Sequence, residues 1–579
     1  MLEKILLTLT ALGNHLSVAQ EPIPKNYFRS PIDTTISLAG NFGELRPNHF
    51  HAGLDIRTGN KEKMAVYAVA DGYVSRIKVS TYGYGRIIYV THPNGFVSVY
   101  AHLSSFADSI ASYMKVRQYE QKTFELELFP KPGELPVKKG ELIARSGNTG
   151  ASGGPHLHFE IREEKTEKAI NPLLFGIPIE DYVKPQLFRL KIYPADEIST
   201  VKNKNEAAEF TLKNTKAGYS ISGTDTIPAS GKIYFGLEAF DTEKPGGGKN
   251  EVYSVELQKN NKRIFYYEMN KIGFDESRTI NSFIDYAAMQ KSNRFFQRAF
   301  IQPNNKLGIY KDVINNGVVE LNADSVYTFK YIVKDLFGNM SQLTFSVQSK
   351  PNKAEKNARE ASKSTNIFRY DQENKFTSTN FSLSIPANTL FDDIDFQFNM
   401  TNSPQPGYYS KIYHVHKQEI PLRDAYTLAI KPWPMDDSTQ KHFVLARLNR
   451  AGGKEFVGAN WQHDSLVCKL KEFGNYFVTT DTIPPVIKPL NILPNKNISR
   501  QKTIELKATD NFSGIKSYDA YIDNNWVLME YEYKQNKFYY IIDQTKAYSP
   551  FSASRKHSFK FIVRDKAGNA RIYETTLQL

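Results

Sequence analysis

The chain carries two histidines one residue apart, in the segment GGPHLHFEIR at residues 153–162. The segment alternates like a β-strand, and successive side chains on a strand point to opposite faces. His156 and His158 therefore point the same way, while Leu157 and Phe159 point to the other face. Two imidazoles on one face can bind a metal or move protons, but an isolated His-x-His is more often a pair of partly exposed strand histidines. Partners elsewhere in the chain decide between these interpretations.

A first candidate partner segment is NHFHAGLDIRTG at residues 48–59, which places His51 four residues before Asp55. On an extended strand these two positions share a face, and Gly53 between them leaves the backbone open to close approach. Together with the same-face histidines, they offer the nitrogen and oxygen ligands that zinc takes. His-x3-Asp alone is weak evidence. The same pattern followed later by His-x-His in Gly-rich, β-patterned sequence is much stronger.

A third element lies between these two segments. VSVYAHLSSF at residues 97–106 alternates apolar and polar side chains and follows an Asn-Gly pair at 94–95, which is a strong hairpin signal. Tyr100 and His102 share a face on this strand. The residues from 42 to 162 therefore predict a compact antiparallel β domain with acidic and imidazole side chains on its strands.

Three segments of this domain resemble the signature segments of the lysostaphin-type zinc endopeptidases, also called the duplicated-hybrid-motif peptidases. They are HFHAGLDI, VYAHLS and GELIARSGNTGASGGPHLHFEIR. The resemblance covers roughly residues 40–175, and the segments stand in the family order. The resemblance implies a metalloendopeptidase, a hydrolase that cuts peptide bonds in the stems or cross-bridges of peptidoglycan during cell wall remodelling.

The resemblance also implies a role for each polar position. His51, Asp55 and His158 would bind one Zn²⁺ ion, and His156 and His102 would flank its open coordination position. Three protein ligands and one open position are typical of a catalytic zinc site. His156 would be the general base, and His102 would orient the substrate or stabilise the oxyanion. The division of labour between these two histidines is left open.

Two other functions compete with this interpretation. A degenerate relative could keep the fold without catalysis, as a scaffold or activator of cell wall amidases whose β modules recruit the amidase. Cleavage of a glycine-rich surface polypeptide is a further alternative. Since all five polar positions are intact, the sequence favours catalysis over a silent scaffold, and the choice of substrate stays open. The departure from the compact family pattern is a long insert at about 104–139, with helical spacing at 105–118 and strand-like alternation at 124–128. We expect this insert to wall or gate the substrate groove.

The rest of the chain contains a repeat. YTFKYIVKDLFGNMSQLTFSV at 327–347 aligns with HSFKFIVRDKAGNARIYETTL at 557–577, and each has a strand, a basic residue before Asp, a Gly-Asn turn and a return strand. Upstream, IYFGLEAFDT and IELKATDNFSG also correspond. These patterns are typical of two immunoglobulin-like modules. No residue here is arranged for chemistry, so we expect a positioning role, by wall binding or by docking to envelope proteins.

The expected fold class is mostly β, with an N-terminal antiparallel lysostaphin-type peptidase domain followed by several β-sandwich, Ig-like domains. The expected order is a signal peptide at 1–19, the peptidase domain at 20–185, an Ig-like sandwich at 186–350, a linker at 351–365, a β-sandwich at 366–480 and an Ig-like sandwich at 481–579.

The first residues, MLEKILLTLTALGNHLSVAQ, have a positive Lys4, a short apolar run and a small-residue site at 17–19, as a secretory signal peptide does. That run is too short to span a bilayer, and no later stretch predicts a transmembrane helix. Cys468 is the single cysteine, so no internal disulfide can form, and no cysteine follows the leader to carry a lipid. We expect an exported protein, in the periplasm or on the outer surface of a bacterium.

The formal net charge of +13 predicts attraction to polyanions. No stripe of Lys and Arg interleaved with aromatics accompanies this charge, so the sequence favours an anionic envelope over nucleic acid. Four other histidines are not expected to take part in chemistry. His49 is expected to be exposed, His92 to lie at the surface before a proline turn, and the pair at 414 and 416 to belong to a β-sandwich strand.

Overall fold

The computed structural model describes residues 23–224, 226–322, 324–350, 366–403, 406–542, 549–551 and 554–579. The expected signal peptide at 1–19 and the expected linker at 351–365 lie outside these residues. Strands far outnumber helices in the described part, which confirms the mostly β prediction. No helix among the described residues is long and apolar enough to cross a membrane.

The strands form four successive units, each with its own cluster of buried apolar side chains. The first unit runs from β1 (Leu38–Gly40) to β14 (Ala169–Ile170), the second from β15 (Gln186–Pro194) to β27 (Met340–Ser349), the third from β28 (Ile367–Phe368) to β39 (Gly474–Thr480) and the fourth from β40 (Val486–Pro489) to β48 (Ala570–Gln578). The chain positions at which one domain passes into the next stay predictions.

The main sheet of the first unit is antiparallel and buried on both faces at its centre. Its strand order is β1, β4 (Leu54–Arg57), β13 (His156–Glu163), β8 (Phe96–Ala101), β7 (Arg86–Thr91), β6 (Gly72–Val79) and β10 (Leu126–Leu128). The central strands are rich in Val, Ile and Tyr, which suit a pleated, half-buried surface. One face contributes to the main core of the unit, and the other packs as a smaller cluster around Tyr89 and Val99. A rigid sheet therefore carries both strands of the histidine motifs.

The insert of the first unit contains α1 (Asp108–Gln121), β10 and β11 (Pro136–Val137). The helix begins and ends about three residues later than the spacing suggested, and β10 overlaps the expected strand at 124–128. The insert faces the fourth unit, where Tyr119 meets Trp526 with ring centroids 5.6 Å apart. Insert and fourth unit line a cavity of about 1100 Å³ whose lining includes Thr149.

The repeated segments form equivalent hairpins. The first is β26 (Val326–Lys334) with β27 in the second unit, and the second is β47 (Lys556–Asp565) with β48 in the fourth.

The second unit also carries two helices, α2 (Ile280–Phe283) and α3 (Tyr286–Ser292), and its long strand β19 (Thr226–Phe240). The third unit pairs two five-stranded sheets, which contain β30 (Phe381–Ile385), β34 (Tyr426–Ile430), β35 (Phe443–Leu448) and β39. A short helix, α4 (Asp437–Gln440), connects β34 to β35. The fourth unit is built around β42 (Thr503–Thr509), β43 (Ile515–Ile522) and β46 (Lys537–Ile541).

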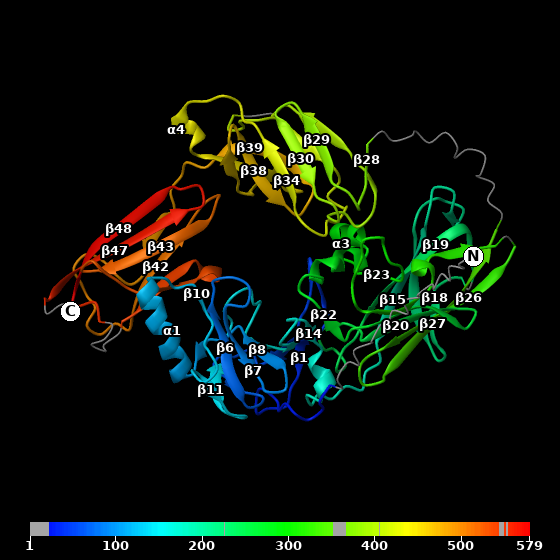
Figure 1. The fold of residues 1–579 in the computed structure, drawn as a ribbon, viewed down its shortest axis with the longest axis horizontal. Coiled ribbons are helices and arrows are strands. Elements are labelled where there is room, and N and C mark those ends of the chain that lie inside the picture. The colour runs from blue at the N-terminus through cyan, green and yellow to red at the C-terminus, as the bar shows by residue number, and fades with distance from the viewer. Residues whose placement is uncertain are drawn as a thin grey trace, which may run out of the picture.

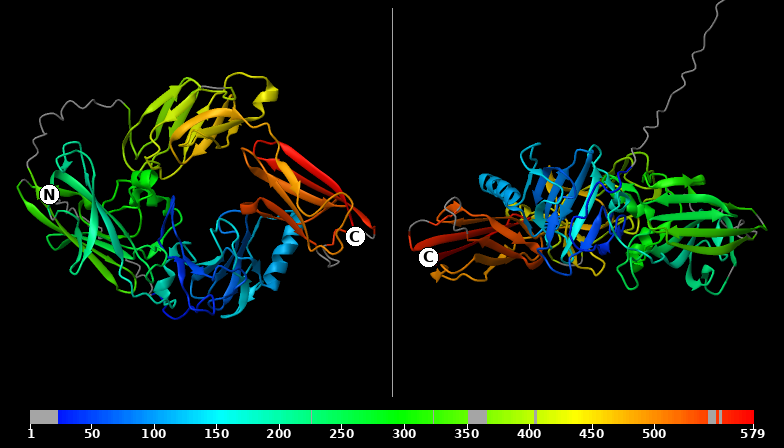
Figure 2. Two further views of the ribbon diagram at one scale, coloured as in Figure 1. Left: turned by 180° about the vertical axis from the view of Figure 1, so that it is seen from behind. Right: turned by 90° about the horizontal axis from the view of Figure 1, so that it is seen from below.

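The four units follow one another in a ring, so that the fourth lies beside the first (Figure 1). The views in Figure 2 show that the units lie in one flat layer. First and second units share a sheet edge, because β14 pairs with β22 (Lys271–Ile272). First and fourth units meet through the Arg86–Glu530 ion pair and a hydrogen bond of 3.0 Å from Lys534 Nζ to Asn148 Oδ1.

The structure agrees with some of the expectations for the histidines outside the main motifs and contradicts one. His49 is exposed, and His414 lies on β33 (Ile412–Val415), where it contacts Thr401 and Asn475. The expectation for His92 is wrong, because this side chain is only 2% exposed. Its Nδ1 lies 2.8 Å from the carbonyl oxygen of Asp71 and its Nε2 lies 2.7 Å from Ser98 Oγ, so both ring nitrogens have partners inside the fold.

Candidate metal centre

Two neighbouring strands and one loop bring a His–Asp–His cluster together. Asp55 on β4 lies directly opposite His158 on β13 in the antiparallel register, and His51 lies in the turn between β3 (His49–Phe50) and β4. Gly53 permits this turn, since a Cβ there would lie 2.3 Å from the backbone oxygen of Phe159. All three residues are buried, with exposed fractions of 6% or less.

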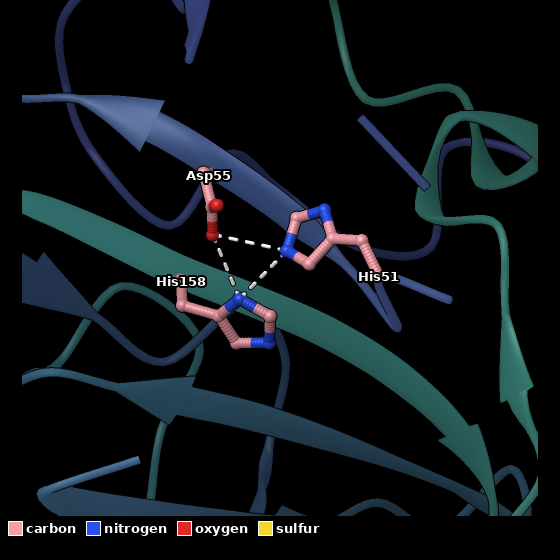
Figure 3. A group of neighbouring side chains, drawn as sticks. All are labelled: His51, Asp55 and His158. Atoms are coloured by element: carbon pink, nitrogen blue, oxygen red, sulfur yellow. Dashed lines mark hydrogen bonds and ion pairs between the residues drawn. The ribbon is translucent and has the colours of Figure 1, made fainter. Parts of the chain in front are cut away.

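The three side chains point at one another, as Figure 3 shows. His51 Nε2 lies 3.0 Å from Asp55 Oδ1 and 3.0 Å from His158 Nδ1, and the third edge, from His158 Nδ1 to Asp55 Oδ1, is 2.8 Å. Bonds of about 2.0–2.1 Å to a tetrahedral ion place ligand atoms about 3.3 Å apart. The triangle is slightly tighter than that, so a small outward shift of the side chains would admit an ion.

Hydrogen bonds on the outer side of each imidazole fix what the inner side can offer. His51 Nδ1 lies 2.6 Å from the carbonyl oxygen of Asn41, and His158 Nε2 lies 2.8 Å from Glu160 Oε1. Both partners only accept hydrogen bonds, so these outer nitrogens carry the protons of the neutral rings. The inner nitrogens then present lone pairs to a carboxylate oxygen. Three electron-pair donors that face one point are a donor set for a cation, which is the arrangement that metal-ligating histidines have.

The electrostatics of the cluster show that a proton competes for the same point. Burial lowers the pKa of His51 to about 4. Burial also acts to lower the pKa of His158, but hydrogen bonds and charges from Asp55 and Glu160 outweigh it and raise the pKa to about 9. Without a metal, His158 therefore holds a second proton at neutral pH. A bound cation would displace that proton, because ligating nitrogens must be deprotonated.

His156 and His102 stand beside the cluster with their rings 4.8 Å apart between centroids. His156, the first residue of β13, has Nδ1 2.8 Å from the carbonyl oxygen of Gly154. His102 follows β8 with a φ of +59°, and its Nδ1 lies 2.8 Å from the carbonyl oxygen of Thr149. Each Nδ1 donates its proton to a carbonyl, so each Nε2 carries a lone pair in the neutral ring.

The remaining Nε2 atoms are available for proton transfer. His156 Nε2 is buried and has no hydrogen-bond partner among the described residues, and it lies 3.3 Å from Asp55 Oδ1. Burial, together with the neighbouring His158 and His156 rings, lowers the pKa of His102 to about 3. His102 is therefore neutral at physiological pH and can only accept a hydrogen bond at Nε2. The five polar positions that the sequence indicated thus lie around one point.

Several residues that support the cluster were missed in the sequence. Glu160 is fully buried and receives hydrogen bonds from Tyr84 Oη at 2.6 Å and from Arg162 Nε at 2.6 Å. Burial acts to raise the pKa of Glu160, but Arg162 and His158 lower it to about 2, so the carboxylate stays charged. The strand period could have found Glu160, because it continues the face of His156 and His158.

Arg46 is the second residue that was missed. Its guanidinium pairs with Asp55 Oδ2 and lies 3.0 Å from Glu44 Oε2. The pair holds the second oxygen of Asp55 away from the cluster, so Oδ1 alone faces the two imidazoles. No spacing in the sequence signals this contact, because the β2 (Leu45–Arg46) to β3 hairpin folds Arg46 back onto the start of β4.

Comparison with known families and proteins agrees with this geometry. The family model described as Peptidase family M23 matches residues 49–121 and 131–172, and a model described as Zu5-like domain matches residues 365–481. An uncharacterized metalloprotease of Haemophilus influenzae is 31% identical over 177 residues, which cover 29% of this chain and 31% of that protein. The murein hydrolase activator NlpD of Escherichia coli is 34% identical over 123 residues, 21% of this chain and 25% of that protein.

Among solved structures, the catalytic domain of the antimicrobial peptidase lysostaphin from Staphylococcus simulans is similar, with 24% identity and a TM-score of 0.18. The match covers 23% of this chain and 87% of that domain. The chain spans about a third or less of the length of the two relatives named above. The His–Asp–His cluster falls inside the segment that the family model matches. Residues 49–172 of this chain therefore carry a domain of Peptidase family M23, the lysostaphin-type family.

Proposed function

We propose that this protein is a zinc-dependent endopeptidase that hydrolyses peptide bonds in the stems or cross-bridges of peptidoglycan. The observation that carries this proposal is the set of three possible ligand atoms, from His51, Asp55 and His158, that converge within 3.0 Å of one another. Two nitrogens and one carboxylate oxygen are ligands of a kind that catalytic zinc takes. When bound there, zinc would act as a Lewis acid on a carbonyl oxygen and would lower the pKa of a water.

The two histidines beside the cluster take separate roles in this proposal. His156 accepts the proton of the attacking water at its unpartnered Nε2 and returns it to the leaving amine. His102 is neutral and accepts at Nε2, so it orients a water or a substrate N–H rather than donating to an oxyanion. The structure thus favours the orienting role of the two that the sequence left open for His102.

The proposed location and partners of the protein rest on its first residues, its charge and its later units. The leader-like first residues and the positive net charge support an exported protein that meets an anionic wall, in the periplasm or on the outer cell surface. Peptidoglycan is the proposed substrate, through its peptide part. The later units support docking to envelope proteins, because the substrate chemistry needs none of their residues.

A second candidate function is activation of a cell wall amidase without catalysis. The similarity to a protein named murein hydrolase activator supports it. The intact set of five polar side chains around one point favours catalysis over this alternative, since an activator does not need convergent lone pairs or a buried base.

The test is digestion of purified peptidoglycan by the full-length protein loaded with zinc. We expect about one zinc per chain and release of new free amines, with both lost in His158→Ala because one of three ligands is gone. His414→Ala is the matched control, since His414 is also a strand histidine, but its ring nitrogens contact Thr401 and Asn475 of the third unit. Equal amine release by wild type and His158→Ala would overturn the proposal. Zinc binding without amine release, with stimulated amidase activity, would favour the activator.

A further inference from the structure

The two repeated modules each bring together three aspartates that nothing in the zinc site uses, all of them buried except Asp510, which is half-buried. In the second unit these are Asp181, Asp241 and Asp335, and in the fourth they are Asp481, Asp510 and Asp565. In each group, ligand oxygens lie within 4.8 Å of one another. The sequence predicts no residue in this region to be arranged for chemistry, because the three acids of each group come from three distant segments and no local spacing reveals them.

The two groups occupy the same positions in the repeat. One member of each lies in the segment that leads into the module, Asp181 before β15 and Asp481 before β40. One lies in the corresponding segments IYFGLEAFDT and IELKATDNFSG, as Asp241 and Asp510. The last precedes the Gly-Asn turn of the repeated hairpin, as Asp335 and Asp565.

The Asn of each turn holds its group in the same way. In the second unit, Asn339 donates from its backbone to Asp335 Oδ1 at 2.9 Å and from Nδ2 to the backbone oxygen of Asp181 at 3.1 Å. In the fourth unit, Asn569 makes the same bonds to Asp565 Oδ1 at 2.8 Å and to the backbone oxygen of Asp481 at 3.0 Å. The geometry is thus built twice from the same residue types.

Each group keeps an oxygen without a partner. Asp241 is only 4% exposed, and its buried Oδ1 has no hydrogen-bond partner among the described residues. In the fourth unit, the backbone N–H of Gly514 donates to Asp510 Oδ2 at 2.7 Å, while the buried Oδ1 is likewise unpartnered. A buried carboxylate oxygen without a donor is costly unless a cation or a proton satisfies it.

Other oxygens near these groups are also unsatisfied. Asn250 pairs with Asp241 through the backbone, and its buried Oδ1 has no hydrogen-bond partner among the described residues. The buried hydroxyl oxygen of Ser513, three residues after Asp510, also has none. Asp181, Asp241, Asn250 and Asp335 line a cavity of about 20 Å³, which is enough for one ion or one water.

The charges around the aspartates also favour a bound cation or a shared proton. No Lys, Arg or His of the described residues forms an ion pair with any of the six aspartates. Burial, together with the charges of Asp181 and Asp335, raises the pKa of Asp241 to about 8. Three acids that repel one another in a buried space bind a cation or share a proton.

We propose that each module binds one Ca²⁺ ion through its three aspartates, Asp181, Asp241 and Asp335 in the second unit and Asp481, Asp510 and Asp565 in the fourth. The donors are oxygens alone, carboxylates with amide or hydroxyl groups beside them, which calcium prefers and zinc does not. Each ion fastens the segment that leads into a module onto the module itself. The first site lies where the chain leaves the first unit, and the second lies where it leaves the third.

The experiment counts calcium on the full-length, zinc-loaded protein after equilibrium dialysis against CaCl₂. We expect two calcium ions per chain in the wild type, one in Asp241→Asn, one in Asp510→Asn and none in the double variant. Asp312→Asn is the control, because Asp312 is half exposed and belongs to neither group, and it should keep two. Calcium should also raise the unfolding temperature of the wild type but not of the double variant.

Several outcomes would overturn the proposal. A wild type that binds no calcium would show that a shared proton satisfies the acids. Calcium counts that do not fall in the Asn variants would place the ions elsewhere. If a variant fails to fold, the wild-type count and the matching Asp335→Asn and Asp565→Asn variants still decide. Zinc content and amine release are read separately, so loss of calcium binding and loss of the peptidase assignment remain distinguishable.

Discussion

At the scale of single residues, the proton on His158 gives the metal centre a measurable pH dependence. The pKa of His158 is raised to about 9 in the metal-free cluster, so the ring is doubly protonated below that pH. Zinc binding at pH 7 must therefore release about one proton, and the apparent zinc affinity should rise about tenfold per pH unit up to pH 9. Calorimetry in two buffers of different ionisation enthalpy measures the released proton. A heat that is independent of the buffer would contradict this account.

Glu160 should tune the affinity of the centre without touching the ion. Its carboxylate accepts the Nε2–H of His158 and so fixes which nitrogen faces inward. Glu160→Gln removes that charge and should weaken zinc binding by about 10- to 100-fold, as loss of an outer partner of a ligand does. Competition with a chromophoric chelator measures the affinity.

A neighbouring residue provides the control for Glu160. Glu167 also contacts Arg162, at 3.1 Å, but it is exposed and does not reach His158. Glu167→Gln should therefore keep wild-type zinc affinity. Equal zinc affinity in Glu160→Gln and wild type would show that His158 needs no outer partner.

At the residue scale, the sequence indicates side chains that converge where a pattern has a fixed period or a family order. His51, Asp55, His102, His156 and His158 were indicated by strand alternation and by the resemblance, and they lie around one point. The supporting contact of Arg46 could not be predicted, because it depends on how the hairpin before β4 folds back. The three-aspartate groups could not be predicted either, because their members lie far apart in the sequence.

At the scale of elements, the centre depends on the contact between β4 and β13. Gly53 lies so close to β13 that an added Cβ would meet the backbone oxygen of Phe159 at 2.3 Å. Gly53→Ala should push the strands apart at the level of Asp55 and His158. We expect a loss of about 1–3 kcal/mol in the free energy of unfolding and at least tenfold weaker zinc binding. Chemical denaturation and chelator competition measure the two effects.

Gly153→Ala is the matched control for this prediction. Gly153 opens the motif that contains His156 and His158, but a Cβ there has no atom within 4 Å and its φ is not positive. This variant should behave like wild type. If Gly53→Ala also keeps wild-type stability and zinc affinity, the close approach of the two strands is not required.

The sequence predicts helices and strands with regular patterns well, but it does not predict which other elements pack against them. The helix and strand of the insert lie within a few residues of the expected ranges, because their apolar spacing is local information. The burial of His92 was predicted wrongly, since a turn residue gives no signal of the strand that covers it. The neighbour of α1 also could not be predicted, because Trp526 lies four hundred residues later in the chain.

At the scale of the whole molecule, the ring depends on contacts between the first and fourth units. The Arg86–Glu530 pair joins residues 444 positions apart, and Tyr539 Oη donates to the same carboxylate at 2.7 Å. No sequence pattern carries such a pairing, so the ring was not predicted. Lys534 Nζ donates a hydrogen bond to Asn148 Oδ1, and the next residue, Thr149, accepts the hydrogen bond of His102 Nδ1. The contact between the first and fourth units therefore also stabilises the loop that orients His102.

Removal of these contacts should open the ring. Glu530→Ala combined with Lys534→Ala removes the carboxylate that Arg86 and the Tyr539 hydroxyl share, which costs about 1–3 kcal/mol. We expect a larger radius of gyration by small-angle X-ray scattering. Glu574→Ala removes an exposed pair with Lys560 within the fourth unit and should leave the scattering unchanged. Identical scattering from the double variant and wild type would mean that other contacts close the ring.

The most direct test of the metal centre is a crystal structure of the zinc-loaded protein with anomalous data collected at the zinc edge. We expect one strong anomalous peak within about 2.0–2.2 Å of His51 Nε2, Asp55 Oδ1 and His158 Nδ1, with a fourth position open toward His156 and His102. A peak bound by other atoms, or no peak at this cluster in protein that contains zinc, would contradict the account.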